Sequence, residues 1–194
     1  MTDAPDDAAL VARVVGGDHD AFTTLMRRHE ERIFAVCLRL MGNRAAALDA
    51  TQETFLALYR KAGQYRATAA VGTWLYRIAI NTCYDLLRRE KRRPAEAMPD
   101  FFDPADRTAE DPFTSVELRP SIEAALQELS PDFRTVVVLA DIQGASLPEV
   151  AEALQVPMGT VKSRLFRARR QLGARLGNLS IDSDHQTRED HDGY

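Results

Sequence analysis

Residues 146–176 constrain the fold more than any other stretch, because they predict two helices joined by a tight turn. Ser146 and Glu149 form a capping-box pattern, in which a hydroxyl and a carboxylate each accept a hydrogen bond from a free backbone N–H at a helix start. The helix that begins after Ser146 is expected to end before Pro157, because proline lacks a backbone N–H. Beyond it, apolar residues recur close to the helical period at Val161, Leu165, Ala168, Leu172 and Leu176. The stretch is therefore predicted to be a helix-turn-helix.

The second of these helices carries charge of one sign. No acidic residue lies between Gly159 and Leu176, whereas solvated helices usually mix signs. Its cations are Lys162, Arg164, Arg167, Arg169, Arg170 and Arg175. A basic helix behind a tight turn is typical of a recognition helix in a DNA major groove. The alternative is an amphipathic helix with a solvated basic face. Phe166 shares one face with Ser163, Arg167 and Arg170, and it either contacts a base or packs on the preceding helix.

Acidic residues are concentrated in three stretches, although the net charge of the whole chain is only −4. Residues 1–7 hold three acids, residues 94–120 hold seven acids and two arginines, and residues 181–194 hold five acids and one arginine. These stretches carry −12, so the rest of the chain carries +8. Salt screens charges beyond about 8–10 Å, so a bound phosphate responds to the local field. The net charge therefore does not exclude a nucleic-acid partner.

The pattern before the first proline-rich stretch is helical with few breakers. Predicted helices cover residues 8–15, 21–40, 44–62 and 73–93. The apolar side of the third helix is predicted to enter the core through Leu48, Phe55, Leu58 and Tyr59. Its opposite side presents two acids and an amide, Asp49, Gln52 and Glu53. This cluster is either a docking surface for a basic partner or a solvated face.

The helix over residues 73–93 combines basic and aromatic side chains. One stripe at helical spacing holds Arg77, Asn81, Tyr84 and Arg88. Further rings and cations are Trp74, Tyr76, Arg89, Lys91, Arg92 and Arg93. Bases stack on rings with about 1–3 kcal/mol each while cations follow the backbone, so the helix suits single-stranded DNA. Two simpler explanations stay open: cations at a helix end favour the helix dipole, and Trp74 equally fits a core position.

The remaining segments complete an all-α prediction. Residues 95–120 are rich in proline and acids and are predicted to be a flexible linker. Helices resume at 121–129 and 133–142, which makes a four-helix module with the helix-turn-helix. Residues 1–7 and 179–194 are predicted to be disordered acidic ends.

Several classes of protein are not favoured. Apolar runs fall far short of the ~18 residues that a membrane span needs, so we expect a cytoplasmic protein without stable membrane insertion. Cys37 and Cys83 lie inside helical patterns and are expected to be buried thiols. Glycine-rich loops, metal-ligand spacings and nucleophile motifs are missing, so we expect no enzyme activity, catalytic residue, metal or cofactor.

Three motifs in a fixed order carry a family resemblance. They are DATQETF at residues 49–55, TWLYRIAIN at residues 73–81 and VPMGTVKSR at residues 156–164. With the basic run to Arg93, they resemble the extracytoplasmic-function (ECF) sigma factors of bacterial RNA polymerase, in the sigma-70 superfamily. The resemblance implies two small helical domains. A promoter-melting domain at residues 8–94 and a four-helix helix-turn-helix domain at residues 121–178 would be joined by the acidic linker.

The resemblance also implies an alternative sigma factor, which binds core polymerase, directs it to promoters through minus-10 and minus-35 elements and promotes DNA melting. The residues that match the surface for the polymerase clamp coiled coil are Asp49, Gln52 and Glu53. Those that match the capture of single-stranded minus-10 DNA are Arg66, Trp74, Tyr76, Arg77, Asn81, Tyr84, Arg88, Arg89, Lys91 and Arg92. Those that match the reading of duplex minus-35 DNA are Thr160, Lys162, Ser163, Arg164, Phe166, Arg167 and Arg170. An anti-sigma factor is the implied antagonist, and the linker would thread toward the active-site and RNA-exit channel.

One departure from the family concerns the turn. The family often has glycine where Gln155 stands. If that position needs a positive φ, glutamine costs about 1 kcal/mol there.

Two rival interpretations remain. A stand-alone helix-turn-helix regulator explains residues 146–176 equally well but not the aromatic and basic stripe of residues 74–93 or the acidic linker. An enzyme is disfavoured by the missing motifs. A regulator would bind duplex operator DNA tightly without polymerase.

Overall fold

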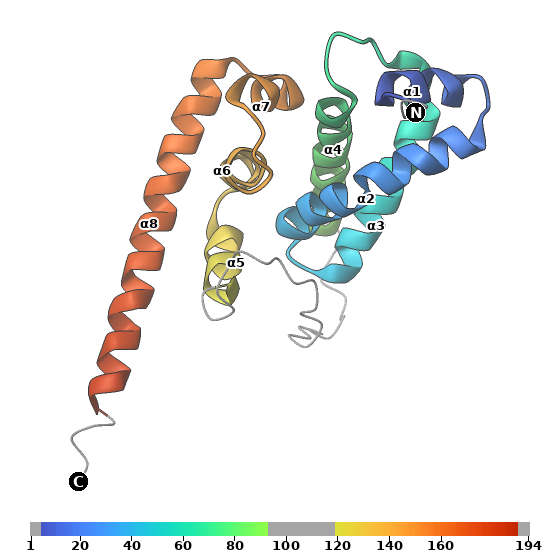
Figure 1. The fold of residues 1–194 in the computed structure, drawn as a ribbon. Coiled ribbons are helices and arrows are strands. Elements are labelled where there is room, and N and C mark those ends of the chain that lie inside the picture. Colours follow the sequence, from blue (N-terminus) through green and yellow to red (C-terminus); the bar gives the residue numbers. More distant parts are fainter. Residues whose placement is uncertain (1–4, 93–118, 190–194) are drawn as a thin grey trace.

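The computed structural model describes residues 5–92 and 119–189, with side chains over residues 5–92 and 121–177. Both ranges are helical and contain no strand, which confirms the all-α prediction. The first range holds α1 (Asp7–Val15), α2 (His19–Met41), α3 (Arg44–Lys61), a 3-10 turn (Ala62–Gln64) and α4 (Val71–Arg92). The second holds α5 (Arg119–Glu128), α6 (Pro131–Val137), a π-helical turn (Val138–Ile142), α7 (Leu147–Leu154) and α8 (Met158–Glu189). We call these ranges the N-terminal and C-terminal modules (Figure 1).

Local sequence signals explain where the N-terminal helices begin and end. Asp6, Asp18 and Asn43 cap α1, α2 and α3, each accepting a backbone N–H at 2.7–2.9 Å. These are the side chains that satisfy free N–H groups best. Gly42 ends α2 at φ 78°, where its N–H donates to the Leu38 carbonyl at 2.9 Å.

The buried side of α3 is narrower than the sequence predicts. Phe55 and Leu58 are buried as expected, but Leu48 is 44% exposed and Tyr59 is 40% exposed, so their placement in the core was wrong. The buried stripe instead runs through Ala47, Ala50, Thr51 and Thr54. Small residues let neighbouring helices approach closely, which leaves the larger side chains beside them on the solvent side.

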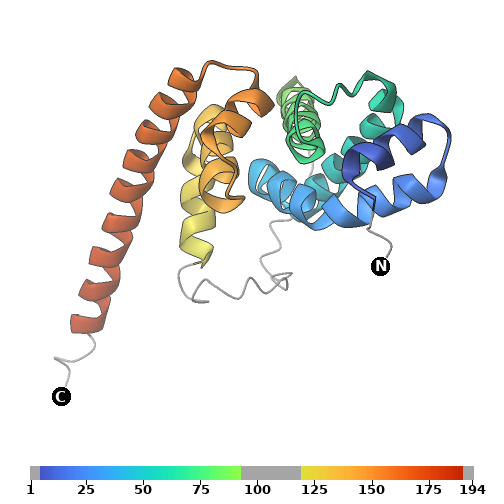
Figure 2. The same cartoon turned by 45° about the horizontal axis from the view of Figure 1, so that its top comes forward.

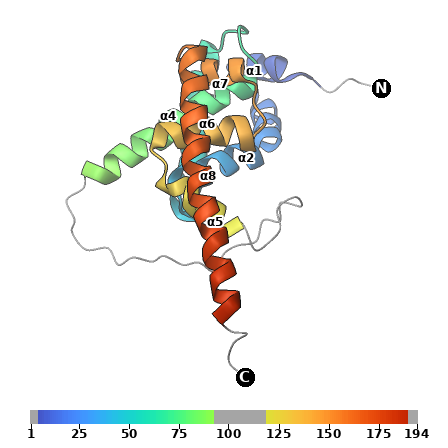
Figure 3. The same cartoon turned by 90° about the vertical axis from the view of Figure 1, so that its left-hand side faces the viewer.

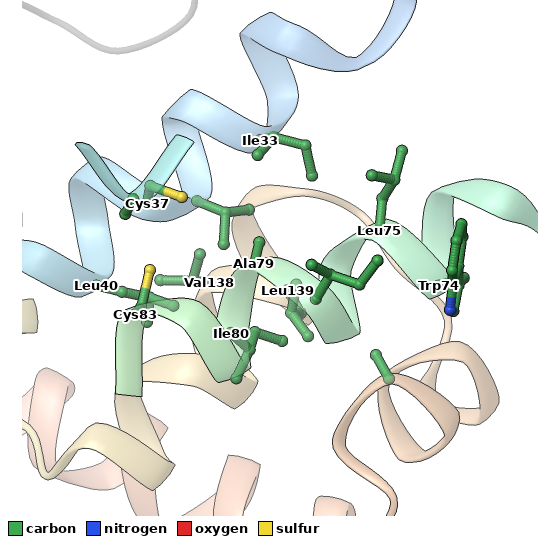
Figure 4. Close-up of a cluster of buried hydrophobic side chains, with 14 of the residues drawn as sticks. Ile33, Cys37, Leu40, Trp74, Leu75, Ala79, Ile80, Cys83, Val138 and Leu139 are labelled. Atoms are coloured by element: carbon green, nitrogen blue, oxygen red, sulfur yellow. The ribbon is translucent and has the colours of Figure 1, made fainter. Parts of the chain in front are cut away.

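The two modules share one apolar core. α4 packs on α7, while α2 packs on α5 and α6 (Figures 1 and 2). Val138 and Leu139 of the C-terminal module lie beside Leu40, Ala79 and Ile80 of the N-terminal module (Figure 4). Cys37 and Cys83 are fully buried in the same region, as predicted. The prediction of two helical modules is confirmed, and the structure adds that they pack against each other.

Helix α8 lies on the outer side of the C-terminal module and extends beyond the other helices (Figures 1 and 3). Its backbone is helical to Glu189, which differs from the disordered tail predicted from residue 179. Proline is missing after Pro157, and once a helix is nucleated each further residue adds one hydrogen bond. The predicted linker and residues 190–194 lie outside the described residues, apart from Arg119 and Pro120.

Candidate nucleic-acid interface

The turn before α8 is built by the residues that the sequence singled out. Glu149 Oε2 accepts the Ser146 backbone N–H at 2.8 Å, and the Glu149 N–H reaches Ser146 Oγ at 3.5 Å. The capping box is therefore present. Hydrogen bonds from the Ser146 side chain and backbone hold the pKa of Glu149 below its ordinary value. The start of α7 is fixed by a charged group that stays ionised near neutral pH.

Gln155 occupies the left-handed region at φ 55° and ψ 41°. Left-handed backbone costs a non-glycine residue about 1–2 kcal/mol. Gln155 offsets part of this cost, because its side-chain Nε2 donates to the Glu152 carbonyl at 2.9 Å. The same carbonyl also accepts the Gln155 backbone N–H at 3.2 Å, so both bonds satisfy an acceptor at the end of α7. Glutamine therefore stands in this chain at a turn position that does have a positive φ, where the family often has glycine.

The cations of α8 divide into two groups. Arg164 pairs with Asp132 at 2.6 Å, Arg169 with Asp141 at 2.6 Å, and Arg175 with Glu128 at 2.7 Å. These pairs fasten α8 to the helices beneath it. Lys162, Arg167 and Arg170 form no ion pair with any residue that the structure describes.

Five exposed residues of α8 lie on one side of the helix. We call them the recognition face: Lys162, Ser163, Phe166, Arg167 and Arg170. Phe166 is 63% exposed, and the Arg170 guanidinium carbon lies 5.9 Å from its ring centroid. Phe166 therefore does not pack on the preceding helix. The recognition face presents cations, a hydroxyl and an aromatic ring together, which is the set of groups that reads phosphates and base edges.

Two members of the predicted minus-35 set lie beside the recognition face. Arg164 is only 27% exposed in its side chain and is neutralised by Asp132. Thr160 is half-buried in the first turn of α8, and its carbonyl accepts the Ser163 hydroxyl at 3.0 Å.

The polar cluster of α3 is fully on the surface. Asp49, Gln52 and Glu53 are all exposed, and Glu53 approaches Arg60 at 3.5 Å. Leu56, which the sequence did not single out, is 52% exposed beside them, and Leu48 is exposed as well. We call these five residues the α3 face. The α3 face therefore presents two carboxylates, an amide and two leucine side chains to solvent.

The aromatic residues of α4 are less accessible than the sequence predicts. Trp74 is only 6% exposed, and its ring lies 5.2 Å from that of Tyr65. Tyr65 donates its hydroxyl to the Ala69 carbonyl at 2.6 Å and so closes the loop before α4. Trp74 nevertheless lines a cavity of about 240 Å³ together with Arg66, Thr73, Arg77 and Glu152. The core interpretation of Trp74 is therefore confirmed, and its side chain also borders this cavity.

Tyr76 and Tyr84 point at the C-terminal module. The Tyr84 hydroxyl lies 2.9 Å from Thr135 Oγ1, and the Tyr76 hydroxyl lies 3.5 Å from Gln143 Oε1. Burial raises the pKa of both tyrosines. Both hydroxyls thus face the C-terminal module, and both side chains are half-buried.

The remaining members of the predicted minus-10 set lie on accessible surface. Those that are exposed are Arg66, Asn81, Arg88, Arg89, Lys91 and Arg92, and Arg77 is half-buried beside the cavity. Arg88 pairs with Asp85 on the same helix. The structure therefore brings Arg66, Trp74 and Arg77 together at one cavity and leaves the basic end of α4 open.

Two negative findings concern the described residues. Among the described residues, His, Cys, Asp and Glu side chains do not gather in groups that could hold a metal ion. Within the same residues, no helix is both long enough and apolar enough to cross a membrane.

Comparisons with known proteins agree with this organisation. Residues 25–93 match the family model Sigma-70 region 2, and residues 119–172 match Sigma-70, region 4. The chain is 41% identical to the ECF RNA polymerase sigma factor SigM of Mycobacterium tuberculosis over 174 residues, which cover 90% of this chain and 86% of SigM. It is 35% identical to the RNA polymerase sigma-H factor of Pseudomonas aeruginosa over 189 residues, covering 92% of this chain and 98% of that factor.

A solved structure shows the same fold. CnrH, solved in complex with the cytosolic domain of CnrY, superposes with a TM-score of 0.67 at 29% identity and covers 89% of this chain and 97% of its own. The chain therefore belongs to the ECF sigma factors of the sigma-70 family, the non-enzymatic initiation factors that direct bacterial RNA polymerase to promoters.

Proposed function

We propose that this sigma factor reads promoters at two separate places, with the recognition face of α8 in the minus-35 duplex and α4 with its cavity on the minus-10 strand. The observation that carries the proposal is the division of cations on α8. Three arginines are neutralised by acids beneath the helix, whereas Lys162, Arg167 and Arg170 form no ion pair within the described ranges. A solvated helix has no need for such a division.

The minus-35 element would be read from the major groove. Arginine binds guanine O6 and N7 with two hydrogen bonds, and each such contact discriminates by about 1–3 kcal/mol. Arg167 is exposed and forms no ion pair within the described ranges, so it is the leading candidate for a base contact. Thr160 and Arg164 remain candidates for phosphate contacts at its edge.

The minus-10 element would be held as a single strand. The cavity of about 240 Å³ offers a ring from Trp74 and cations from Arg66 and Arg77. A base taken out of the stack is held by aromatic contacts and edge hydrogen bonds, and holding it shifts DNA toward the melted state. The cations after Asn81, namely Arg88, Arg89, Lys91 and Arg92, would follow the backbone. Tyr76 and Tyr84 would join this surface only after the C-terminal module moves away.

The α3 face would bind core polymerase. Asp49 and Glu53 supply negative charge for a basic partner, Gln52 supplies an amide, and Leu48 and Leu56 supply apolar area. A polar cluster with apolar neighbours is a typical composition for a transient protein interface.

We also propose the domain boundaries of this sigma factor, a regulatory partner and the compartment in which it acts. The melting domain would span residues 8–94 and the helix-turn-helix domain residues 121–178, with the linker at residues 95–120. We propose an anti-sigma factor as a further partner, because a relative at the level of the fold, RpoE of Bartonella quintana, was solved with the anti-sigma factor NepR. The chain would act in the cytoplasm, where it meets polymerase and DNA.

The dependence of DNA binding on polymerase tests this proposal. Genomic upstream fragments are mixed with the chain alone, with core polymerase alone and with both, and the bound fragments are sequenced. We expect enrichment of shared paired motifs only when both proteins are present. Tight and specific capture by the chain alone would contradict the proposal and favour a stand-alone regulator.

A further inference from the structure

The loop that joins the 3-10 turn to α4, residues 65–70, is closed by its own hydrogen bonds (Figure 1). Tyr65 Oη donates to the Ala69 carbonyl at 2.6 Å, and we call this bond the clasp. Inside it, the backbone N–H of Thr68 donates to the Arg66 carbonyl at 2.6 Å, and the Thr68 hydroxyl donates to the same carbonyl at 3.3 Å. All of these bonds are made within the loop, so they give it a defined shape in the free chain.

Tyr65 is anchored to the N-terminal module by its backbone and by its ring. Its backbone N–H donates to the Ala62 carbonyl at 3.1 Å, and α1 packs on the 3-10 turn that contains Ala62. Its ring lies 5.2 Å from the ring of Trp74 at an interplanar angle of 46°, within the range of favourable aromatic contacts. Trp74 is 6% exposed, so it offers the tyrosine a fixed surface. The clasp therefore ties the far end of the loop to the core of the module.

The Tyr65 hydroxyl keeps its proton near neutral pH. Burial raises the pKa of this hydroxyl, and the negative charges of Asp6, Asp7 and Glu152 raise it further. The direction matters because a carbonyl oxygen can only accept a hydrogen bond, so a deprotonated tyrosine could not bond to Ala69. The clasp therefore does not open by titration near neutral pH.

The clasp supports one wall of the cavity that we propose for a minus-10 base. The loop residues that line this cavity include Arg66, Thr68 and Ala69. The clasp holds Ala69 directly, and the Tyr65 ring contacts Trp74, which lines the cavity from α4. Tyr65 itself is not one of the described residues that line the cavity. Its effect on a bound base is thus indirect, through the positions of the lining residues.

We propose that Tyr65 is a positioning residue for promoter reading, which uses the clasp to hold the cavity in a shape that accepts one kind of unpaired DNA base. The inference rests on the proposed role of the cavity and names the residue that sets its selectivity. A site that is shaped in advance loses little conformational entropy when its ligand binds. It also rejects ligands of another shape, because accepting them would break the clasp. A loop without the clasp would have to order on binding and could adapt to several bases.

Tyr65→Phe in the full chain tests the clasp with a one-atom change. The variant loses the bond to the Ala69 carbonyl but keeps the ring that contacts Trp74. Tyr59→Phe is the matched control, because it removes the same atom from an exposed tyrosine of α3 whose ring contacts Phe22. Urea unfolding compares the stability of both variants with that of the unmodified chain.

Hydrogen exchange of the loop amides in the free chain gives the first readout. We expect the Thr68 amide to exchange about threefold to tenfold faster in Tyr65→Phe, because one neutral hydrogen bond favours the closed loop by about this factor. Tyr59→Phe should match the unmodified chain. Equal exchange rates in all three proteins would overturn the inference, and this result needs neither DNA nor polymerase.

Base selectivity gives the second readout, and a merely structural role of Tyr65 would not change it. Holoenzyme is made from core polymerase with each variant and is mixed with a pool of short single-stranded oligonucleotides of random sequence, and the bound fraction is sequenced. We expect the unmodified chain to prefer one base strongly at one position. Tyr65→Phe should lower that preference about threefold or more and leave the preferences at other positions unchanged. A structural defect would instead weaken the binding of all sequences alike.

The outcomes separate this inference from the proposed function. Faster loop exchange with an unchanged preference at every position would overturn the role of Tyr65 and leave minus-10 reading by the cavity in place. A lack of base preference at every position in the unmodified holoenzyme would contradict the proposed role of the cavity, and the inference would fall with it.

Discussion

Arg164 of α8 forms an ion pair with Asp132 of α6 at 2.6 Å. This second cation of the recognition helix therefore joins α8 to α6, although part of its side chain remains exposed. Arg167, three positions later, is exposed and forms no ion pair with the described residues. Neighbouring arginines on one helix thus have different tasks. Charge counts along the sequence do not distinguish them.

Replacing Arg167 by alanine should reduce transcription from promoters that carry the native minus-35 element. A lost bidentate base contact costs about 1–3 kcal/mol, or roughly fivefold to 150-fold in affinity. Transcription assays on promoters with native and altered minus-35 elements measure the effect. Arg169→Ala is the matched control, because it removes the same charge from a residue that is paired with Asp141. A uniform loss over all promoters for Arg167→Ala would argue against base reading.

Replacing Asp49 and Gln52 together by alanine should weaken binding to core polymerase about tenfold or more, since the change removes a charge and an amide from the centre of the α3 face. Binding is measured by competition with a labelled sigma factor. The double change of Glu30 and Glu31 to alanine, at exposed positions of α2, serves as the control. Unchanged core binding by the α3 variant would assign that face to solvent.

Substitutions of Gln155 test whether the turn between α7 and α8 needs a positive φ. Gln155→Val should destabilise the chain by about 1–2 kcal/mol, because a β-branched residue is strained in left-handed backbone. Gln155→Gly should be close to neutral, since relief of strain is offset by the lost hydrogen bond to the Glu152 carbonyl and by the larger entropy of an unfolded glycine. Urea unfolding gives both values. Equal stability of the valine and glycine variants would show that the turn does not need a positive φ.

The lowered pKa of Asp7 predicts how the stability of the fold depends on pH. Its burial raises the pKa, but hydrogen bonds from Arg28 at 2.9 Å and His29 at 2.6 Å outweigh burial and hold the pKa below its ordinary value. An aspartate with a lowered pKa in the folded state stabilises the fold above its unfolded pKa of about 3.9 and loses this contribution as pH falls through the folded value. Asp7→Asn should therefore lower the free energy of unfolding by about 1–2 kcal/mol at pH 7 and by progressively less below about pH 4. A constant difference across this range, measured against Glu31→Gln, would contradict the assignment.

Most of the helices could be predicted from local signals. Asp6, Asp18, Asn43 and Ser146 stand where helices begin, and Gly42 stands where one ends. The helix-turn-helix followed from its capping box and its apolar spacing. These features act within a few residues, so one sequence is enough to see them.

Other features depend on contacts between distant segments. Arg134 resembles any surface arginine in the sequence, yet it is buried because the end of α2, some ninety positions earlier, supplies an acceptor. Tyr84 fits a DNA-facing stripe by spacing, but Thr135 covers it. Leu48 and Tyr59 look like core residues, and they are exposed because alanines and threonines already line the close contacts of α3. Which face of a helix meets a partner is decided by tertiary packing.

Run-off transcription with bacterial core polymerase tests the central claim most directly. The purified chain, core polymerase and a pool of upstream genomic fragments are combined, and the 5′ ends of the transcripts are mapped. The account predicts transcripts that start at a fixed distance from paired minus-35 and minus-10 motifs and that vanish when the chain is left out. Transcripts that are unchanged without the chain, together with tight duplex binding by the chain alone, would contradict two-site promoter reading.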